Sequence, residues 1–93
     1  MPLIFEWDPD KARANAANHG VDFPEAATVF ADGLSVTIPD PDHSLGEQRF
    51  VTLGMTHRQQ LLVVAHTEMG DRIRIISARR ATRQEQRNYE QGT

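Results

Sequence analysis

The stretch RFVTLGMTHRQQLLVVAHTEMGDRIRIISA, residues 49–78, decides the fold because it contains three apolar segments separated by short polar turns. The spacing of its apolar residues predicts strands over 49–55, 61–68 and 72–78. The turns are predicted near residues 57–59 and at Gly70-Asp71. Strands joined by such short connections pair antiparallel, because a parallel crossover needs about a dozen residues or more.

Two helices are predicted before this stretch. Asp8-Pro9 is typical of a helix start, since the aspartate caps the first turn and the proline fits a position that needs no N–H. Gly20 is typical of the end of that helix. A second helix is predicted over about 23–31, because Asp22 and Glu25 have the spacing of a capping box.

Two more strands and a last helix complete the prediction. Residues 3–6 have the pattern of a short opening strand, and residues 34–38 that of an edge strand ending at a proline. Thr82 and Glu85 repeat the capping-box spacing and predict a final helix. We therefore expect one α+β domain over residues 1–93, a mainly antiparallel β-sheet with two N-terminal helices and one C-terminal helix.

The charges are distributed unevenly along the chain. The net charge of the 93 residues is −3, but residues 1–47 carry two cations against nine acids, whereas residues 48–93 carry eight arginines, no lysine and four acids. Such asymmetry points to a polyanion-binding end, and the planar guanidinium fork suits phosphate. The alternative is that these arginines are solvated surface groups paired with nearby carboxylates.

The composition also indicates where the protein resides. The chain contains no cysteine, which excludes disulfides and thiol chemistry and fits a reducing compartment. The N-terminal segment has no apolar region typical of a signal peptide, and no apolar run is long enough to span a bilayer. We expect a cytoplasmic protein.

The loop between the last two predicted strands decides which polar side chains meet. An odd number of loop residues places His66 and Glu68 on the same face as Arg72 and Arg74, whereas a two-residue loop at Gly70-Asp71 places them on opposite faces. On a shared face, the histidine and the glutamate would carry protons while the arginines hold phosphoryl oxygens, as RNA cleavage without metal requires. The alternative is that Glu68 simply pairs with an arginine across the strands.

Several stretches of the chain resemble the BrnT family of toxins. They are Phe5-Glu6-Trp7-Asp8, Lys11, Asn15, His19-Gly20-Val21, Phe23, Glu25-Ala26, Asp42-His43-Ser44, Gly46-Glu47, Arg49, residues 74–82, Glu85 and Tyr89. They keep the order and spacing of the family motifs over almost the whole chain. One departure is Asn18, where the family commonly has a lysine before the His-Gly pair, so this helix has one cation fewer.

The resemblance implies a function and partners. It implies a RelE-like fold and a metal-independent endoribonuclease that needs no cofactor and arrests growth by blocking translation. It also implies a small ribbon-helix-helix antitoxin, similar to BrnA, which neutralises the toxin and through which the complex binds DNA. A membrane partner is not expected.

Nine residues are the candidates for the site. We expect catalytic roles for Arg79, Arg80, Arg49, His66, Glu68 and Tyr89, and RNA binding by Arg72, Arg74 and Lys11. Arg79 is the preferred contact of the scissile phosphate, and the guanidinium groups are expected to gather on one solvent-reachable patch. Alternatives remain for each assignment. His66 would be a satisfied, partly buried histidine, and Arg49 would pair with Glu47. Lys11 would be a solvated cation, and Tyr89 would pack on the sheet instead of stacking or donating a proton.

Other interpretations concern the remaining polar and aromatic residues. Asp40, Asp42 and His43 include metal-ligand types, but their spacing and the neighbouring prolines argue against a metal site. Phe5 and Trp7 are expected in the core or in contact with the antitoxin. Two alternative functions stay open: a non-catalytic module that binds RNA or a protein, and a degenerate toxin that serves only as the partner of its antitoxin.

Overall fold

A computed structural model of the chain describes residues 2–40 and 48–92. Its elements follow the order β1 (Ile4–Glu6), α1 (Pro9–His19), α2 (Phe23–Ala27), the 3-10 turn η1 (Thr28–Ala31), β2 (Val36–Pro39), β3 (Arg49–Met55), β4 (Leu61–Met69), β5 (Arg72–Arg80) and α3 (Arg83–Glu90). The predicted mixed α+β class is confirmed.

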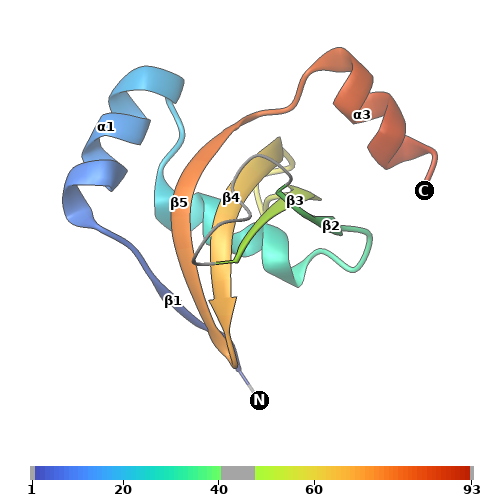
Figure 1. Cartoon of the computed structure of the whole chain (residues 1–93). Coiled ribbons are helices and arrows are strands. Elements are labelled where there is room, and N and C mark those ends of the chain that lie inside the picture. The colour runs from blue at the N-terminus through green and yellow to red at the C-terminus, as the bar shows by residue number, and fades with distance from the viewer. Residues whose placement is uncertain (1, 41–47, 93) are drawn as a thin grey trace.

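The strands form one sheet with the order β1-β5-β4-β3-β2 within the described residues. The pairs β2–β3, β3–β4 and β4–β5 are antiparallel, whereas β1 pairs with β5 in parallel through Ile4–Arg72, Phe5–Ile73 and Glu6–Arg74. In Figure 1, strand β5 runs between α1 and α3, which stand apart from each other. Strand β5 therefore pairs with β1 from the N-terminal end of the chain and leads into α3 at the C-terminal end.

The helix ends follow the capping signals in the sequence. The Asp8 side chain accepts a hydrogen bond from the backbone of Asp10, and Gly20 ends α1 in the left-handed conformation, with a φ of 68°. The helix predicted over 23–31 is divided into α2 and the tighter turn η1. At the junction, the Thr28 hydroxyl donates to the carbonyl of Glu25, a local bond that competes with regular helix geometry.

One face of the sheet is covered by α1, α2 and η1, and we call it the core face. The buried apolar side chains between these layers are Val21, Phe23, Ala26, Val29, Leu62, Val64, Ile73, Ile75 and Ala78. Gly54 of β3 lets η1 approach closely, because a Cβ on this glycine would lie 3.1 Å from the Cβ of Val29. The opposite face, which these three elements do not cover, we call the open face.

The β4–β5 hairpin has a two-residue loop and a β-bulge. Met69 pairs with Arg72 across Gly70-Asp71, and this register continues to His66–Ile75. The next pair is Ala65–Ser77, so Ile76 is an extra residue on β5. The sequence left open whether residues of like or of unlike parity pair in this hairpin, and each pairing is found in one half of it. Near the turn, residues of unlike parity pair, and beyond the bulge, residues of like parity pair.

Candidate functional site

Arginines from two strands lie on the open face of the sheet. Cross-strand partners project on the same face, so Arg49, Thr67 and Arg74 form one row across β3, β4 and β5. Arg72 follows on the same face of β5, because it lies two residues from Arg74 near the turn. The open face therefore has a cationic end formed by three guanidinium groups.

Glu6 of β1 pairs with two of these arginines. Its carboxylate oxygens accept hydrogen bonds from Nη1 of Arg72 at 3.1 Å and from Nη1 of Arg74 at 3.3 Å. The arginine side chains stay 59 % and 45 % exposed, so water weakens both ion pairs. Glu6 therefore offsets part of the positive charge of Arg72 and Arg74, and Asp40 lies beside Arg49, because its N–H donates to the Arg49 carbonyl at 2.9 Å.

Arg79 projects on the same open face at the other end of β5. The bulge at Ile76 reverses the alternation, so that Arg79 shares a face with Arg74 although their numbers differ in parity. Five residue steps of strand separate them by roughly 15 Å. The expected single patch is therefore an elongated face with arginines at both ends.

A bidentate ion pair joins Arg79 to the start of α3. Nη1 and Nη2 of Arg79 donate to the two carboxylate oxygens of Glu85, each at 2.9 Å. Glu85 also accepts from the backbone N–H of Thr82 at 2.8 Å, which completes the capping box of α3. The hydrogen bond from Arg79 lowers the pKa of Glu85 to about 2 and raises the pKa of Arg79. Both groups are therefore ionised throughout the physiological range.

Asn15 of α1 fixes the segment of β5 next to Arg79. Its side-chain amide donates to the carbonyls of Ala78 at 2.8 Å and Val21 at 3.0 Å, and its Oδ1 accepts from the N–H of Ala78 at 3.0 Å. The side chain is buried and acts like an added piece of backbone along β5. The sequence marked Asn15 only as part of the family resemblance, and its clamping role was not predicted.

Arg80 does not join the other arginines. It pairs with Leu62 across β4 and β5 and therefore projects toward the side opposite to Arg79. There it lines a cavity of about 400 Å³ together with Gln86 and Tyr89 of α3. The sequence allowed one or both adjacent arginines to reach a phosphate, and the structure brings only Arg79 to the open face.

His66 does not lie beside the arginines. Of the two arrangements considered from the sequence, the one that places His66 on the same face as Arg72 and Arg74 is therefore wrong. Its ring is fully buried on the core face between Phe30 and Phe50, with centroid distances of 4.8 and 6.0 Å. Nε2 lies 2.7 Å from the hydroxyl of Thr52, while Nδ1 is buried without a hydrogen bond among the described residues. Burial lowers the pKa of His66 to about 4. The structure therefore does not bring this neutral, enclosed ring to the open-face arginines, and a buried histidine is the alternative that it favours.

Glu68 is likewise on the side opposite to Arg72 and Arg74, because it pairs with Ile73 on the core face. The ion pair with Arg72 or Arg74, which is the alternative to a catalytic role for Glu68, is therefore not formed among the described residues. Its carboxylate lies near the histidine ring, with Oε2 of Glu68 3.6 Å from Nδ1 of His66. The physical reason is the two-residue loop, which reverses the pairing that an odd loop would have given.

Tyr89 anchors α3 to the rest of the domain. Its hydroxyl donates to Oδ2 of Asp32 at 2.6 Å, and this bond raises the pKa of Tyr89 to about 12. Asp32 also accepts from the backbone N–H of Met55 and of Leu34. Because the phenol is already engaged and titrates so high, this conformation favours an anchoring role over proton donation.

Two remaining predictions concern Lys11 and the metal-ligand types. Lys11 is exposed on α1, the helix that packs on the core side of β5, so the structure does not bring it to the open-face arginines. Asp42 and His43 lie outside the described residues. Within residues 2–40 and 48–92, no three histidine, aspartate or glutamate side chains lie close enough to hold a metal ion.

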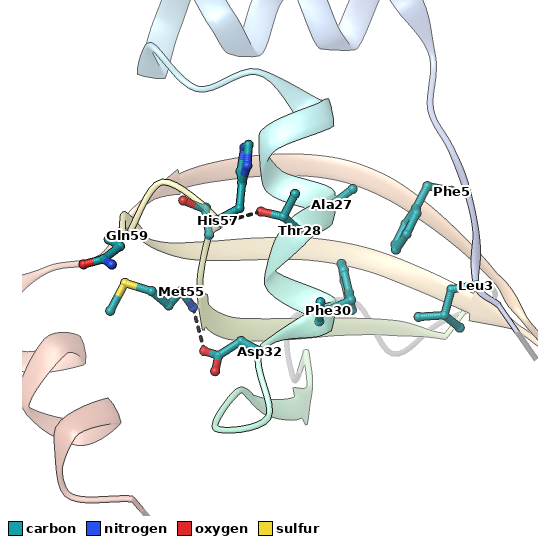
Figure 2. Close-up of a pocket in the computed structure, with 11 residues that line it drawn as sticks. Leu3, Phe5, Ala27, Thr28, Phe30, Asp32, Met55, His57 and Gln59 are labelled. Carbon is teal, nitrogen blue, oxygen red and sulfur yellow. Dashed lines mark hydrogen bonds between the residues drawn. The ribbon is translucent and has the colours of Figure 1, made fainter.

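A groove beside η1 contains none of the predicted site residues. It has a volume of about 880 Å³ and passes over η1, between Leu3 and Phe5 on one side and the β3–β4 turn on the other. Figure 2 shows two hydrogen bonds that tie this turn to the helical segment, from the N–H of His57 to Thr28 and from the N–H of Met55 to Asp32. The groove is mostly apolar and lies apart from the arginines.

A second apolar groove lies on the open face next to α3. Five aliphatic side chains form its floor, and Glu85 and Asn88 of α3 form its wall; the floor residues are Val36, Ile38, Val51, Leu53 and Val63. The floor adjoins Arg79, because Val63 is the cross-strand partner of Arg79. The open face thus offers cationic ends and an aliphatic middle, an arrangement that suits a polyanion with apolar parts or a protein segment.

Comparisons with known proteins agree with this architecture. A family model described as "Ribonuclease toxin, BrnT, of type II toxin-antitoxin system" matches residues 7–85. Among solved structures, the chain is similar to the 1.1 Å crystal structure of the Brucella abortus ribonuclease toxin BrnT, with a TM-score of 0.65 and 23 % identity. That similarity covers 89 % of this chain and 99 % of the Brucella chain. No curated protein matches the chain.

Proposed function

Because the chain belongs to the BrnT family of ribonuclease toxins of type II toxin–antitoxin systems, we propose that it is a metal-independent endoribonuclease acting on the open face. The observation that supports this site best is the elongated face on which Arg49, Arg72, Arg74 and Arg79 project together. Guanidinium groups bind phosphoryl oxygens through parallel N–H donors, so such a face suits an RNA strand that contacts it at more than one phosphate.

Arg79 is proposed as the contact of the scissile phosphate. It is the open-face arginine held most firmly, since Glu85, the strand and the Asn15 clamp fix its surroundings. When the 2′-oxygen of RNA attacks phosphorus, negative charge grows on the phosphoryl oxygens, and a fixed guanidinium stabilises that charge without reorganising. Loss of one such donor typically costs about 100- to 1,000-fold in kcat.

The family also implies an antitoxin partner for this chain. We propose that the partner is a ribbon-helix-helix protein, that the complex binds DNA through it, and that free toxin blocks translation in the cytoplasm. An antitoxin that covers the open face would exclude RNA from the arginines. The aliphatic floor beside Arg79 supports this, because exposed aliphatic side chains in one patch are typical of surfaces that a protein covers.

A non-catalytic RNA-binding module is the second candidate, and one specific observation favours it. The described carboxylates that lie next to the open-face arginines of β5, Glu6 and Glu85, are both paired with those arginines. His66 is the histidine that the sequence placed at the site, and it is buried on the core face. Under this alternative the arginines hold RNA without cleaving it.

The experiment compares Arg79→Gln with Arg13→Gln in the purified protein, using a fluorescently labelled RNA. Arg13 is a matched control, because it is also paired with a carboxylate, Asp10, but lies exposed on α1. We expect the wild type to cleave RNA, Arg79→Gln to lose about 100-fold in kcat, and Arg13→Gln to stay within threefold. Circular dichroism checks that both variants fold. RNA that is bound but left intact by the wild type would favour the second candidate.

A further inference from the structure

We propose that Glu85 is a positioning residue of the nuclease site, which holds Arg79 so that one parallel pair of its N–H groups is presented to a phosphate. This inference rests on the proposed function, since it gives Glu85 a role only through Arg79. It goes beyond the capping role that the Thr82-x-x-Glu85 spacing indicates, because the same carboxylate bonds the guanidinium at two atoms.

The hydrogen bonds of Arg79 leave one edge of its guanidinium unused. A guanidinium has five N–H donors arranged as a rigid fork. In Arg79, Nη1 and Nη2 each donate to Glu85, and Nη1 also donates to the carbonyl of Arg80 at 3.2 Å. Nε–H and the second N–H of Nη2, which lie side by side, make no hydrogen bond within the described part of the chain. This parallel pair matches the spacing of two phosphoryl oxygens.

The geometry of Glu85 explains why this edge keeps one direction. The carboxylate is fixed by the backbone N–H of Thr82 at the first turn of α3 and is itself only 28 % exposed. The Arg79 side chain, which is 43 % exposed, is therefore held between α3 and the carbonyl at the end of β5 and stays partly accessible to solvent. An arginine without this clamp would sample several rotamers and lose conformational entropy on binding a phosphate.

Glu85 also carries a cost for substrate binding, which makes the proposal testable. Its negative charge lies beside the cation that attracts RNA, so it opposes binding while it favours orientation. A residue that only strengthened the fold would not separate these two effects. We therefore expect removal of the charge to leave RNA affinity unchanged or tighter and to lower kcat.

The test measures Glu85→Gln, Thr82→Ala and the double variant Arg79→Gln/Glu85→Gln against the wild type. Glutamine at the third helical position keeps the capping box, so the first variant removes the charged clamp but not the cap. We expect Glu85→Gln to lower kcat by about 100-fold, the size of effect that misplacing a reacting group produces, with an unchanged or lower Kd for RNA carrying a 2′-deoxy block. We expect Thr82→Ala, which weakens only the cap, to keep kcat within threefold.

The double variant separates failure of this inference from failure of the proposed function. If Glu85 acts through Arg79, then adding Glu85→Gln to Arg79→Gln changes kcat no further. An independent readout is the Nε–H resonance of Arg79 in NMR spectra, expected to be sharp in the wild type and exchange-broadened in Glu85→Gln. Full kcat in Glu85→Gln, with Arg79→Gln inactive, overturns the positioning role alone. Full kcat in Arg79→Gln overturns the role of Arg79 and with it the proposed site.

Discussion

The hydroxyl of Tyr89 donates a 2.6 Å hydrogen bond to Asp32, which precedes it by 57 residues. No residue of α3 is buried, and the helix is tied to the domain by this bond and by the pair between Arg79 and Glu85. The position of α3, and with it the wall of the groove beside Arg79, therefore depends on polar contacts and not on apolar packing.

Replacing Tyr89 with phenylalanine removes this bond and keeps the ring. Because the acceptor is a carboxylate, we expect the free energy of unfolding to fall by about 1–2 kcal/mol, measured by urea denaturation at pH 7. Gln86→Ala, an exposed change on the same helix, is the control. If Tyr89 serves only as an anchor, kcat stays within threefold, whereas a loss of 100-fold or more in a folded Tyr89→Phe protein would restore its proposed role in proton transfer.

Burial of His66 predicts a decline of stability in mild acid. The folded pKa of about 4 lies below the ordinary value of 6.5, so between these pH values the unfolded chain binds a proton that the folded chain does not. Stability is therefore complete above pH 6.5 and falls by up to about 3 kcal/mol as the pH approaches 4, less any help that nearby Glu68 gives the protonated ring.

The measurement is urea denaturation of the wild type and His66→Gln at pH 7.5, 6.0 and 4.5. Glutamine retains a donor and acceptor for Thr52 but does not titrate, so the variant should show a flatter profile over this window. The pKa of Glu85 is about 2 in the folded protein against an ordinary 4.5, so its contribution to stability is complete at pH 7.5 and 6.0 and begins to decline near pH 4.5, equally in both proteins. Parallel profiles for the two proteins would show that His66 is not the group responsible.

The clamp made by Asn15 predicts a large loss of stability from a small truncation. Asn15→Ala leaves the N–H and C=O of Ala78 and the carbonyl of Val21 without their partner in a buried region. We expect a loss of about 3 kcal/mol. Asn18→Ala, an exposed asparagine on the same helix, should change stability by less than about 0.5 kcal/mol. Equal effects of the two substitutions in thermal unfolding would contradict the clamp.

The close approach of η1 to Gly54 predicts that a larger residue at this position destabilises the fold. A Cβ at this position would lie 3.1 Å from the Cβ atoms of Val29 and Ser35 and 3.2 Å from the carbonyl oxygen of Val29. Because two of the three atoms belong to η1, a shift of that turn is required, and we expect Gly54→Ala to cost about 1–3 kcal/mol. Gly33→Ala, where a Cβ meets nothing within 4 Å, is the matched control in the same denaturation series.

Much of the fold was predictable because its signals are local. The strand over 49–55 and the ends of α1 follow from apolar spacing and from capping residues such as Asp8 and Gly20, which act within a few positions of the chain. The same holds for Thr82 and Glu85 at the start of α3. The mixed α+β class followed from the order of these elements.

The candidate site was only partly predictable because its decisive features are not local. The sequence grouped the arginines on one face but gave no signal for the bulge at Ile76, which separates Arg79 from Arg80. The central place of His66 on its strand left burial and catalysis equally open, and the contact with Phe30 that encloses the ring joins distant segments. The pair between Arg79 and Glu85 depends on how the chain bends after β5, and a spacing of six residues does not specify that bend.

The additional residue at Ile76 has a consequence for comparing this chain with its homologues. Consider a relative whose strand has the same number of residues as β5 but no bulge. Its open face would carry the side chain that aligns with Arg80, and the residue that aligns with Arg79 would face the core. A relative one residue shorter would keep the equivalent of Arg79, but only if its gap is placed at Ile76. Conservation at either arginine column is therefore informative only after strands have been superimposed, and an ungapped alignment would assign the phosphate contact to the wrong column.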